Sequence, residues 1–275
     1  MKKALKYLVV FLVIQFVMTF LVTLIWQMAG GMGLSQAIIS IFNGSQELSI
    51  PMLITIQAVF SMVVLVVFLW RKWCVVSNTY LKTWPWLVFF WAVVAALGTL
   101  VPSELFQELV PMKDVNSELL GGMMASRWGY LAVCIFAPLV EELVFRGAIL
   151  RSLLGSLNNH WTAILISALI FAFAHLNPAQ MPHAFCLGVL LGWMYYRTYS
   201  VIPGIIVHWV NNTVAYVTYN MLPNAKDFRL IDFWGGSQLH IGLAVVFSLL
   251  IFIPAIVQLH LHMKRADKVS DMNFK

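Results

Sequence analysis

The chain has 275 residues, of which 61% are hydrophobic and 10% are charged, and its mean hydropathy is +0.86. Soluble domains carry about 25% charged residues, so this composition excludes an ordinary soluble protein and indicates a protein embedded in a membrane. The formal net charge of +6 is better explained by membrane topology than by a nucleic-acid partner, because the basic residues lie between apolar stretches. The cysteines Cys74, Cys134 and Cys186 are too few and too scattered for a disulfide framework or a CxxC metal site.

Apolar stretches near or above the length of about 20 residues that crosses a bilayer recur along the whole chain. The first of them has the basic start of a signal peptide, but its apolar region is too long for one and lacks a convincing cleavage site. We therefore interpret it as the first transmembrane helix. The predicted spans are residues 7–28, 50–70, 84–101, 128–145, 161–176, 182–197, 201–221 and 239–261.

Lys and Arg residues fall mostly on alternate loops between these spans. Loops rich in Lys and Arg stay in the cytoplasm, so the alternation places both termini there and requires an even number of spans. The predicted fold is an all-α, polytopic bundle of about eight transmembrane helices. The predicted location is a cell membrane, and the short loops are typical of a bacterial protein. The predicted cytoplasmic segments hold Lys2, Lys3, Lys6, Arg71, Lys72, Lys82, Arg146, Arg151, Arg197, Lys264, Arg265, Lys268 and Lys275, and the outer loops hold Lys113, Arg127, Lys226 and Arg229.

The chain shows no internal repeat and no flexible linker, so we expect one embedded domain with three parts. Residues 1–127 form the N-terminal spans and an outer loop, residues 128–222 contain most of the intramembrane polar residues, and residues 223–275 form the last span and a basic tail. The acidic segment 102–126 is either a short helix on the outer surface or an ordinary loop. Gly188 and Gly192 have the spacing that lets two helices of one chain pack closely.

Polar side chains inside the predicted spans are few. An ionisable side chain at the centre of a membrane helix costs about 2.5–3.5 kcal/mol, so each one needs a partner, a water-filled cavity or a function. Those that require an explanation are Glu141, Glu142, Arg146, His175, His208, Asn211 and Asn212. The histidines at span ends or in the tail are interpreted as interfacial residues: His160, His183, His240, His260 and His262.

Glu142 and Arg146 are four residues apart on a predicted helix, so their side chains face one another and can form an ion pair. Such a pair has a purely structural interpretation, because it can simply hold helices together. Glu141 is rotated by about 100° from Glu142, which leaves its carboxylate without this partner and available as a general base.

The two later polar spans add nitrogen-bearing side chains. His208 and Asn212 are four residues apart and lie on one face of their helix. Phe171 lies one turn before His175, where its ring can pack against the imidazole or line a cavity. Three helices that each offer a polar group to an apolar bundle are what a buried reaction centre requires.

These residues form three motifs in order: EELVFR at residues 141–146, FAFAH at 171–175 and HWVNN at 208–212. They resemble the Glu-Glu-x-x-x-Arg, Phe-x-x-x-His and His-x-x-x-Asn motifs of the CPBP (Abi) family of intramembrane proteases. That family includes CAAX-prenyl endopeptidases and bacteriocin-processing or self-immunity proteins. The resemblance covers residues 128–222, which would be the catalytic core.

The resemblance also implies roles for the matched residues. Glu141 and His175 would activate the attacking water, and His208 and Asn212 would stabilise the oxyanion. Glu142, Arg146 and Phe171 would support them. The family is often classed as metalloendopeptidases, but HExxH is absent, so we expect chemistry without a metal or other cofactor. If zinc is present, Glu141, His175 and His208 would bind it.

The function that follows is an endopeptidase acting on a membrane-associated peptide or protein within the lipid bilayer. One alternative is a catalytically silent scaffold that regulates a membrane partner, such as a sensor kinase, or mediates bacteriocin self-immunity. A proton-coupled transporter also uses intramembrane acids and histidines, but the internal repeat that usually accompanies it is not seen. Nucleic acid is not an expected partner.

Overall fold

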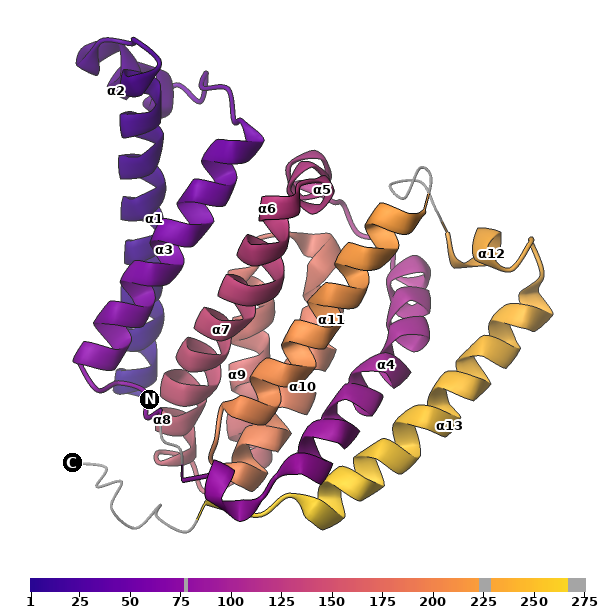
Figure 1. The fold of residues 1–275 in the computed structure, drawn as a ribbon. Coiled ribbons are helices and arrows are strands. Elements are labelled where there is room, and N and C mark those ends of the chain that lie inside the picture. Colours follow the sequence, from indigo (N-terminus) through magenta and orange to yellow (C-terminus); the bar gives the residue numbers. More distant parts are fainter. Residues whose placement is uncertain (77–78, 223–228, 267–275) are drawn as a thin grey trace.

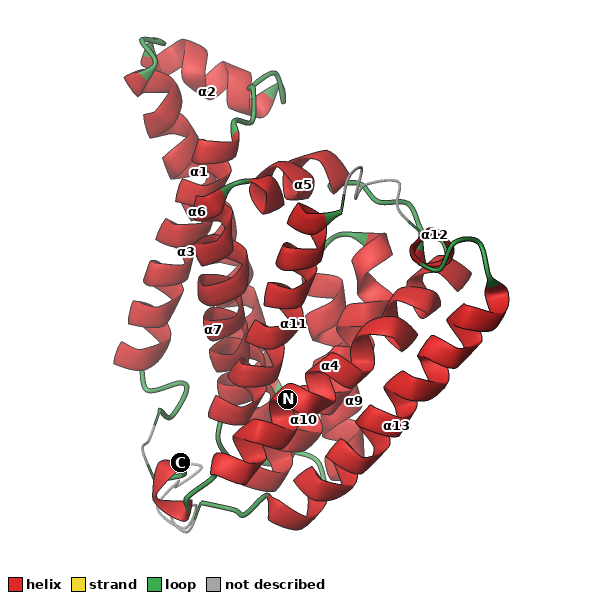
Figure 2. Ribbon diagram, turned by 45° about the vertical axis from the view of Figure 1, so that its right-hand side comes forward, coloured by secondary structure: helices red, strands yellow, loops and turns green. Residues whose placement is uncertain are grey.

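The structure, a computed structural model, describes residues 1–76, 79–222 and 229–266. Within these ranges the chain forms helices and no β-strand, as the sequence predicts for an all-α bundle (Figures 1 and 2). Three of the basic residues used to predict the topology, Lys226, Lys268 and Lys275, lie outside the described residues.

A helical segment lies at each of the predicted spans. Among the described residues, four helices are both long and apolar enough to cross a membrane, namely α1, α3, α4 and α13. The fifth predicted span is a shorter apolar helix, α9. The segments are α1 (Lys2–Ala29), α3 (Ile50–Trp70), α4 (Trp86–Leu109), a continuous helical stretch over residues 127–154, α9 (His160–Ala174), α10 (Met181–Thr198), α11 (Ile202–Met221) and α13 (Gln238–His262).

The stretch over residues 127–154 alternates between α-helical and π-helical turns. Its wider turns are marked by hydrogen bonds from the Ala137 N–H to the Ala132 carbonyl oxygen and from the Arg151 N–H to the Arg146 carbonyl oxygen, each five residues back. Such turns change the direction in which side chains project and are frequent at functional sites. The parts are α6 (Arg127–Gly129), η2 (Tyr130–Phe136), α7 (Ala137–Glu141), η3 (Glu142–Leu150) and α8 (Arg151–Leu154).

Shorter helices complete the chain. The helices α2, α5 and α12 lie at the end of the bundle opposite the N-terminus (Figure 1). The acidic segment 102–126 is partly a continuation of α4, which runs through Pro102, and partly α5. The bounds are α2 (Leu34–Phe42), η1 (Leu81–Thr83), α5 (Ser117–Ala125), η4 (Pro178–Gln180) and α12 (Leu230–Phe233).

Small residues set the spacing of the central helices. A methyl group at Gly188 would lie 3.0 Å from the Cβ atom of Ala168, and one at Gly192 would lie 3.0 Å from the Cγ2 atom of Ile164. The close packing within the chain that was predicted for these two glycines is therefore confirmed, with α9 as the partner of α10.

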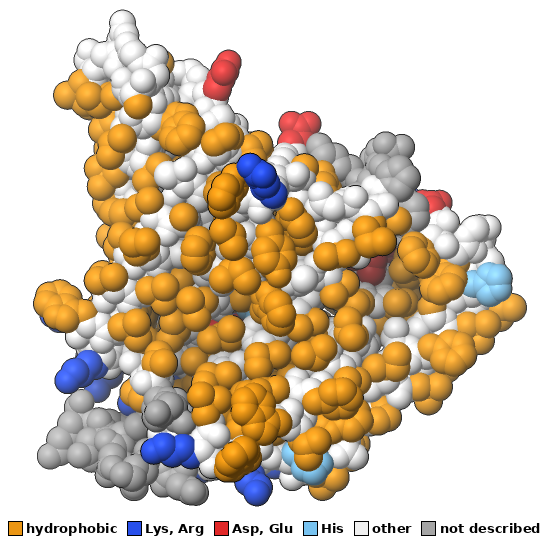
Figure 3. Space-filling view, viewed as in Figure 1, with side chains coloured by type: hydrophobic (Ala, Val, Ile, Leu, Met, Phe, Trp, Pro, Cys, Tyr) orange, Lys and Arg blue, Asp and Glu red, His pale blue; other side chains and the backbone are white. Residues whose placement is uncertain are grey.

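Helix α10 also separates the two hydrophobic cores. One core joins α10 to α1, α3, η3 and α9, and the other joins it to α4, α11 and α13. Figure 3 shows most of the visible Lys and Arg side chains at the end of the bundle that carries the N-terminus, and the Asp and Glu side chains mainly toward the opposite end. Polar residues in the middle of this apolar bundle are thus held between two packed halves.

Candidate active site

The Glu142–Arg146 pair is completely buried at the start of η3. The Nη1 atom of Arg146 donates a hydrogen bond to the Oε1 atom of Glu142 at 2.6 Å. The side chain of Arg146 is 1% exposed and that of Glu142 is 0% exposed. The Nη2 atom donates to the carbonyl oxygen of Gly188 at 3.3 Å, and the guanidinium carbon lies 4.3 Å from the ring centre of Phe171. The predicted ion pair is confirmed, and it connects η3 to α9 and α10.

His208 of α11 lies between the two neighbouring glutamates. Its Nδ1 atom is 3.1 Å from the Oε1 atom of Glu142, and its Nε2 atom is 3.7 Å from the Oε2 atom of Glu141. The other oxygen of Glu142 has no hydrogen-bond partner among the described residues and faces Gly204, where a Cβ atom would lie 2.8 Å away. The imidazole of His208 is thereby held by the buried carboxylate of Glu142 on one side, and its other nitrogen lies near the carboxylate of Glu141.

These groups border a large cavity of about 830 Å³. The Glu141 side chain is 22% exposed, whereas Glu142 and Arg146 do not line the cavity. The first glutamate therefore differs from the second in the way the sequence predicts: it points to an accessible space and not to Arg146. The predicted site residues that line the cavity are Glu141, Phe171, His175, His208 and Asn212.

His175 and Phe171 bring α9 to the same cavity. The Nδ1 atom of His175 lies 2.9 Å from the carbonyl oxygen of Phe171, so this nitrogen is held by the backbone one turn before it. The Phe171 ring meets His175 edge-on at 4.8 Å between ring centres and His208 edge-on at 5.8 Å. Phe171 therefore fixes the positions of both imidazoles.

Asn212 lies one turn after His208 on α11. Its Nδ2 atom donates to the carbonyl oxygen of Val133 at 2.9 Å, and its Oδ1 atom accepts a hydrogen bond from Asn211 at 3.2 Å. A side-chain amide carries two N–H donors, so the bond to Val133 uses one and leaves the other for the cavity.

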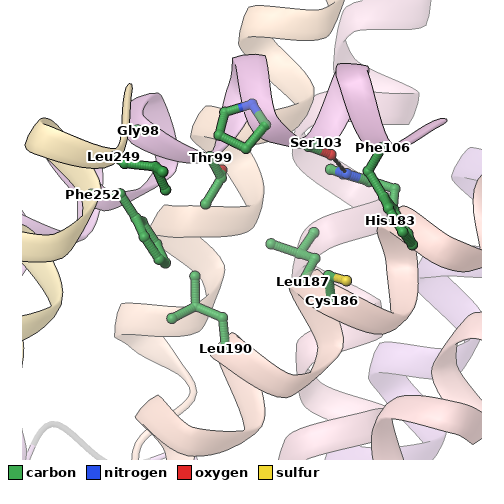
Figure 4. A pocket seen from close by; sticks show the side chains of 11 residues that line it. Gly98, Thr99, Ser103, Phe106, His183, Cys186, Leu187, Leu190, Leu249 and Phe252 are labelled. Carbon is green, nitrogen blue, oxygen red and sulfur yellow. Dashed lines mark hydrogen bonds between the residues drawn. The ribbon is translucent and has the colours of Figure 1, made fainter. Parts of the chain in front are cut away.

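The sequence missed a third histidine in this region. His183, in the first turn of α10, lines the cavity and is close enough to His175 and His208 to interact with them electrostatically. It also forms a hydrogen bond with Ser103 of α4, at the edge of a smaller, apolar cavity of about 310 Å³ (Figure 4). Its place at the beginning of a predicted span had indicated an interfacial residue.

Two glutamines were also missed. Gln15 of α1 and Gln57 of α3 line the large cavity, although both helices precede the motif-bearing segment. Because glutamine is uncharged, a search for ionisable residues inside spans does not find it. The only signal in the sequence was an amide in the middle of an otherwise apolar run.

The donor set does not form a metal site. Within residues 1–76, 79–222 and 229–266, no group of three or more His, Cys, Asp or Glu side chains is arranged to hold a metal ion. Glu141, His175 and His208, which we expected to be the ligands if zinc is present, share the cavity without forming such a group. We therefore derive no catalytic step through a metal.

Comparisons with known proteins agree with the motifs. Residues 124–214 match the family model described as "Type II CAAX prenyl endopeptidase Rce1-like". The chain is 30% identical over 142 residues to "UPF0177 protein YxdF" of Lactococcus lactis, covering 48% of this chain and 77% of that protein. It is 34% identical over 98 residues to "Membrane-embedded CAAX protease MroQ" of Staphylococcus aureus, covering 34% of this chain and 40% of that protein. No solved structure matches.

The family match, the two bacterial relatives and the apolar helices all lead to the same assignment. The matched residues 124–214 include every motif residue that borders the cavity or supports it. The chain belongs to the CPBP family of membrane proteases, and it is a multi-pass membrane protein.

Proposed function

We propose that the protein is an intramembrane endopeptidase that hydrolyses a peptide bond in a membrane-associated peptide or protein. The observation that carries this proposal is one cavity bordered by an acid, two imidazoles and an amide from three separate helical segments. Peptide hydrolysis needs a base for water, a proton donor for the leaving amine and donors for the oxyanion. These side chains supply all three.

Glu141 is the general base in this proposal. Its carboxylate faces the cavity, whereas the neighbouring Glu142 is already paired with Arg146. It accepts a proton from the water that attacks the scissile carbonyl carbon. General bases of this kind contribute about 10²–10⁴-fold to rate.

His175 holds the same water and later supplies a proton. When its Nδ1–H donates to the carbonyl oxygen of Phe171, its Nε2 atom carries the lone pair. That lone pair accepts a hydrogen bond from the water. The proton that Glu141 takes from the water then passes to this Nε2 atom, and the resulting imidazolium delivers it to the nitrogen of the leaving amine as the C–N bond breaks, which restores the Glu141 carboxylate.

His208 and Asn212 stabilise the oxyanion. Glu142 accepts a hydrogen bond from the Nδ1–H of His208, and this bond fixes the ring with Nε2 toward Glu141. A proton on Nε2 and the second N–H of Asn212 then donate to the developing negative charge. Loss of one such donor typically lowers kcat by about 10²–10³-fold.

The membrane arrangement is part of the proposal. We infer eight spans with both termini in the cytoplasm, supported by the helices at the predicted positions and by the separation of basic and acidic residues (Figure 3). The cavity is also lined by α5 and α12, which lie opposite the N-terminus (Figure 1). Membrane-associated substrates therefore enter from the lipid or from that end.

The test compares cells that carry the intact protein, Glu141→Ala or the control Glu118→Ala, which changes an exposed acid on α5. All three proteins must reach the membrane in equal amounts. Peptides from the membrane and from the medium are then identified by mass spectrometry. We expect products that depend on the intact protein, that persist with Glu118→Ala and that disappear with Glu141→Ala. An unchanged peptide profile with Glu141→Ala would contradict proteolysis and favour a scaffold.

A further inference from the structure

Gln15 and Gln57 lie in the middle of two of the most apolar helices of the chain. Both α1 and α3 meet the length and composition required to cross a membrane. A side-chain amide placed in hydrocarbon without a hydrogen-bond partner is strongly unfavourable. Neither residue belongs to the segment 124–214 that matches the family model. Their presence therefore needs a reason that the matched motifs do not supply.

The two amides face the cavity that holds the proposed catalytic residues. Gln15 and Gln57 line it together with Glu141 and His208. The Nε2 atom of Gln57 is 3.4 Å from the Oγ atom of Ser61, a long hydrogen bond within its own helix. The Gln15 amide forms no hydrogen bond with any described residue, and neither of its polar atoms is among the fully buried, unpartnered ones. Both side chains retain donors and acceptors for a ligand.

A pairing role between α1 and α3 does not explain these residues. If the glutamines served to hold the two helices together, their amides would be expected to bond to each other across the interface. Instead the one side-chain hydrogen bond that Gln57 forms with a described residue is to Ser61 on the same helix. The helices are held together by apolar contacts such as that of Phe11 with Phe60, whose ring centres are 5.3 Å apart.

A continuous aromatic wall joins the glutamines to the histidines. Phe11 lies one turn before Gln15, and Phe60 lies three residues after Gln57. All four phenylalanines of this wall line the cavity, so a bound chain can follow it from one group of polar residues to the other. The distances between ring centres are 5.3 Å for Phe11–Phe60, 5.4 Å for Phe11–Phe145, 5.1 Å for Phe145–Phe171 and 4.8 Å for Phe171–His175.

We propose that Gln15 and Gln57 form a subsite for the peptide backbone of an extended substrate segment beside the scissile bond. This inference rests on the proposed proteolytic function. A peptide bond in a helix has its N–H and C=O groups occupied, so the substrate must be unwound before water can attack it. In a low-dielectric cavity the freed groups need new partners. A glutamine amide offers one acceptor and two donors, and so matches backbone groups whatever the side chains are.

The first test measures hydrolysis by purified protein in lipid vesicles. The probe is a synthetic form of the peptide whose release depends on Glu141. Gln15→Met and Gln57→Met keep the length of the side chain and remove its hydrogen bonds; Gln258→Met in α13 is the control outside the cavity. We expect KM to rise about tenfold for each cavity variant, the loss of about one hydrogen bond, with kcat within about twofold of the unchanged protein. Unchanged KM in both cavity variants would overturn the proposal.

The second test locates the substrate directly and does not depend on turnover. A photo-reactive phenylalanine derivative is placed at position 15 or 57 in the Glu141→Ala protein, and the same peptide is added before illumination. Position 137 lines the cavity and is the positive control, and position 13 lies on the lipid-facing surface of α1 and is the negative control. Adducts at 15, 57 and 137 but not at 13 support the subsite, and adducts at 137 alone overturn it. If no peptide depends on Glu141 in cells, the proposed function itself fails, and this inference fails with it.

Discussion

Arg146→Met removes the cation that pairs with the buried carboxylate of Glu142. The change also removes the hydrogen bond to the Gly188 carbonyl oxygen and the contact with the Phe171 ring. Methionine fills much of the same volume, so a cavity contributes little to the effect. What remains is a carboxylate that is 0% exposed and, among the described residues, has His208 as its one side-chain hydrogen-bond partner.

Removal of one partner from a buried ion pair typically costs about 3–5 kcal/mol, because the other charge stays buried without compensation. We expect the free energy of unfolding of Arg146→Met to fall by this amount. Replacement of both partners by apolar residues is often neutral or stabilising. The double variant Glu142→Leu/Arg146→Met should therefore be within about 2 kcal/mol of the unchanged protein and clearly more stable than Arg146→Met.

The assay is reversible unfolding in mixed detergent micelles, followed by circular dichroism, for the unchanged protein, both single variants and the double variant. Stability that returns in the double variant without catalytic activity would show that the pair is needed for the position of His208 and not for folding. Losses that simply add, so that the double variant is the least stable of the four, would refute the interpretation of this site as a buried, coupled pair.

Three further results are expected. Gly204→Ala places a Cβ atom 2.8 Å from the Oε2 atom of Glu142 and should lower the free energy of unfolding by about 1–3 kcal/mol in the same assay. The control Gly242→Ala places a Cβ atom with no neighbour within 4 Å and should not destabilise the protein. Equal effects of the two changes would contradict the close packing of Gly204 on Glu142. Cys74 lies in the turn after α3, and burial raises its pKa to about 11. The Cys74 thiol should therefore resist maleimide at pH 8 in native membranes, and rapid labelling at that pH would argue against a buried Cys74. Because the folded form keeps the thiol proton to a higher pH than the unfolded form does, the free energy of unfolding should fall as the pH rises from about 9 to 11. Rigorous chelation should leave peptide hydrolysis unchanged, and activity lost on chelation and restored specifically by zinc would refute the metal-free mechanism.

The helices could be located from the sequence because each apolar run is long enough to form one. The ends were less certain, as α4 shows. The predicted span stops at residue 101, before Pro102, but the helix continues to Leu109. A proline within a helix removes one hydrogen bond, here to the carbonyl oxygen of Gly98. Gly98 packs directly against the backbone of Phe252 in α13, and this tertiary contact is not visible in local sequence.

The chemistry of the candidate site was partly predictable. Spacing along one helix gave the Glu142–Arg146 pair and separated Glu141 from it. The position of His208 between Glu141 and Glu142 was not predictable, because it depends on how α11 packs against η3 and on π-helical turns that no local sequence pattern predicts. His183 was missed for the same reason: the turn that follows α9 brings it back toward the cavity.

The central claim is that an acid and an imidazole from different helices act as one hydrolytic centre. The most direct measurement is the initial rate of peptide hydrolysis in lipid vesicles by the unchanged protein, Glu141→Gln, His208→Gln and the double variant. We expect each single change to lower kcat by at least about 10²-fold, and the double change to be no worse than the more severe single change, because residues that act as a unit are not additive. Either single variant with the rate of the unchanged protein would contradict the account.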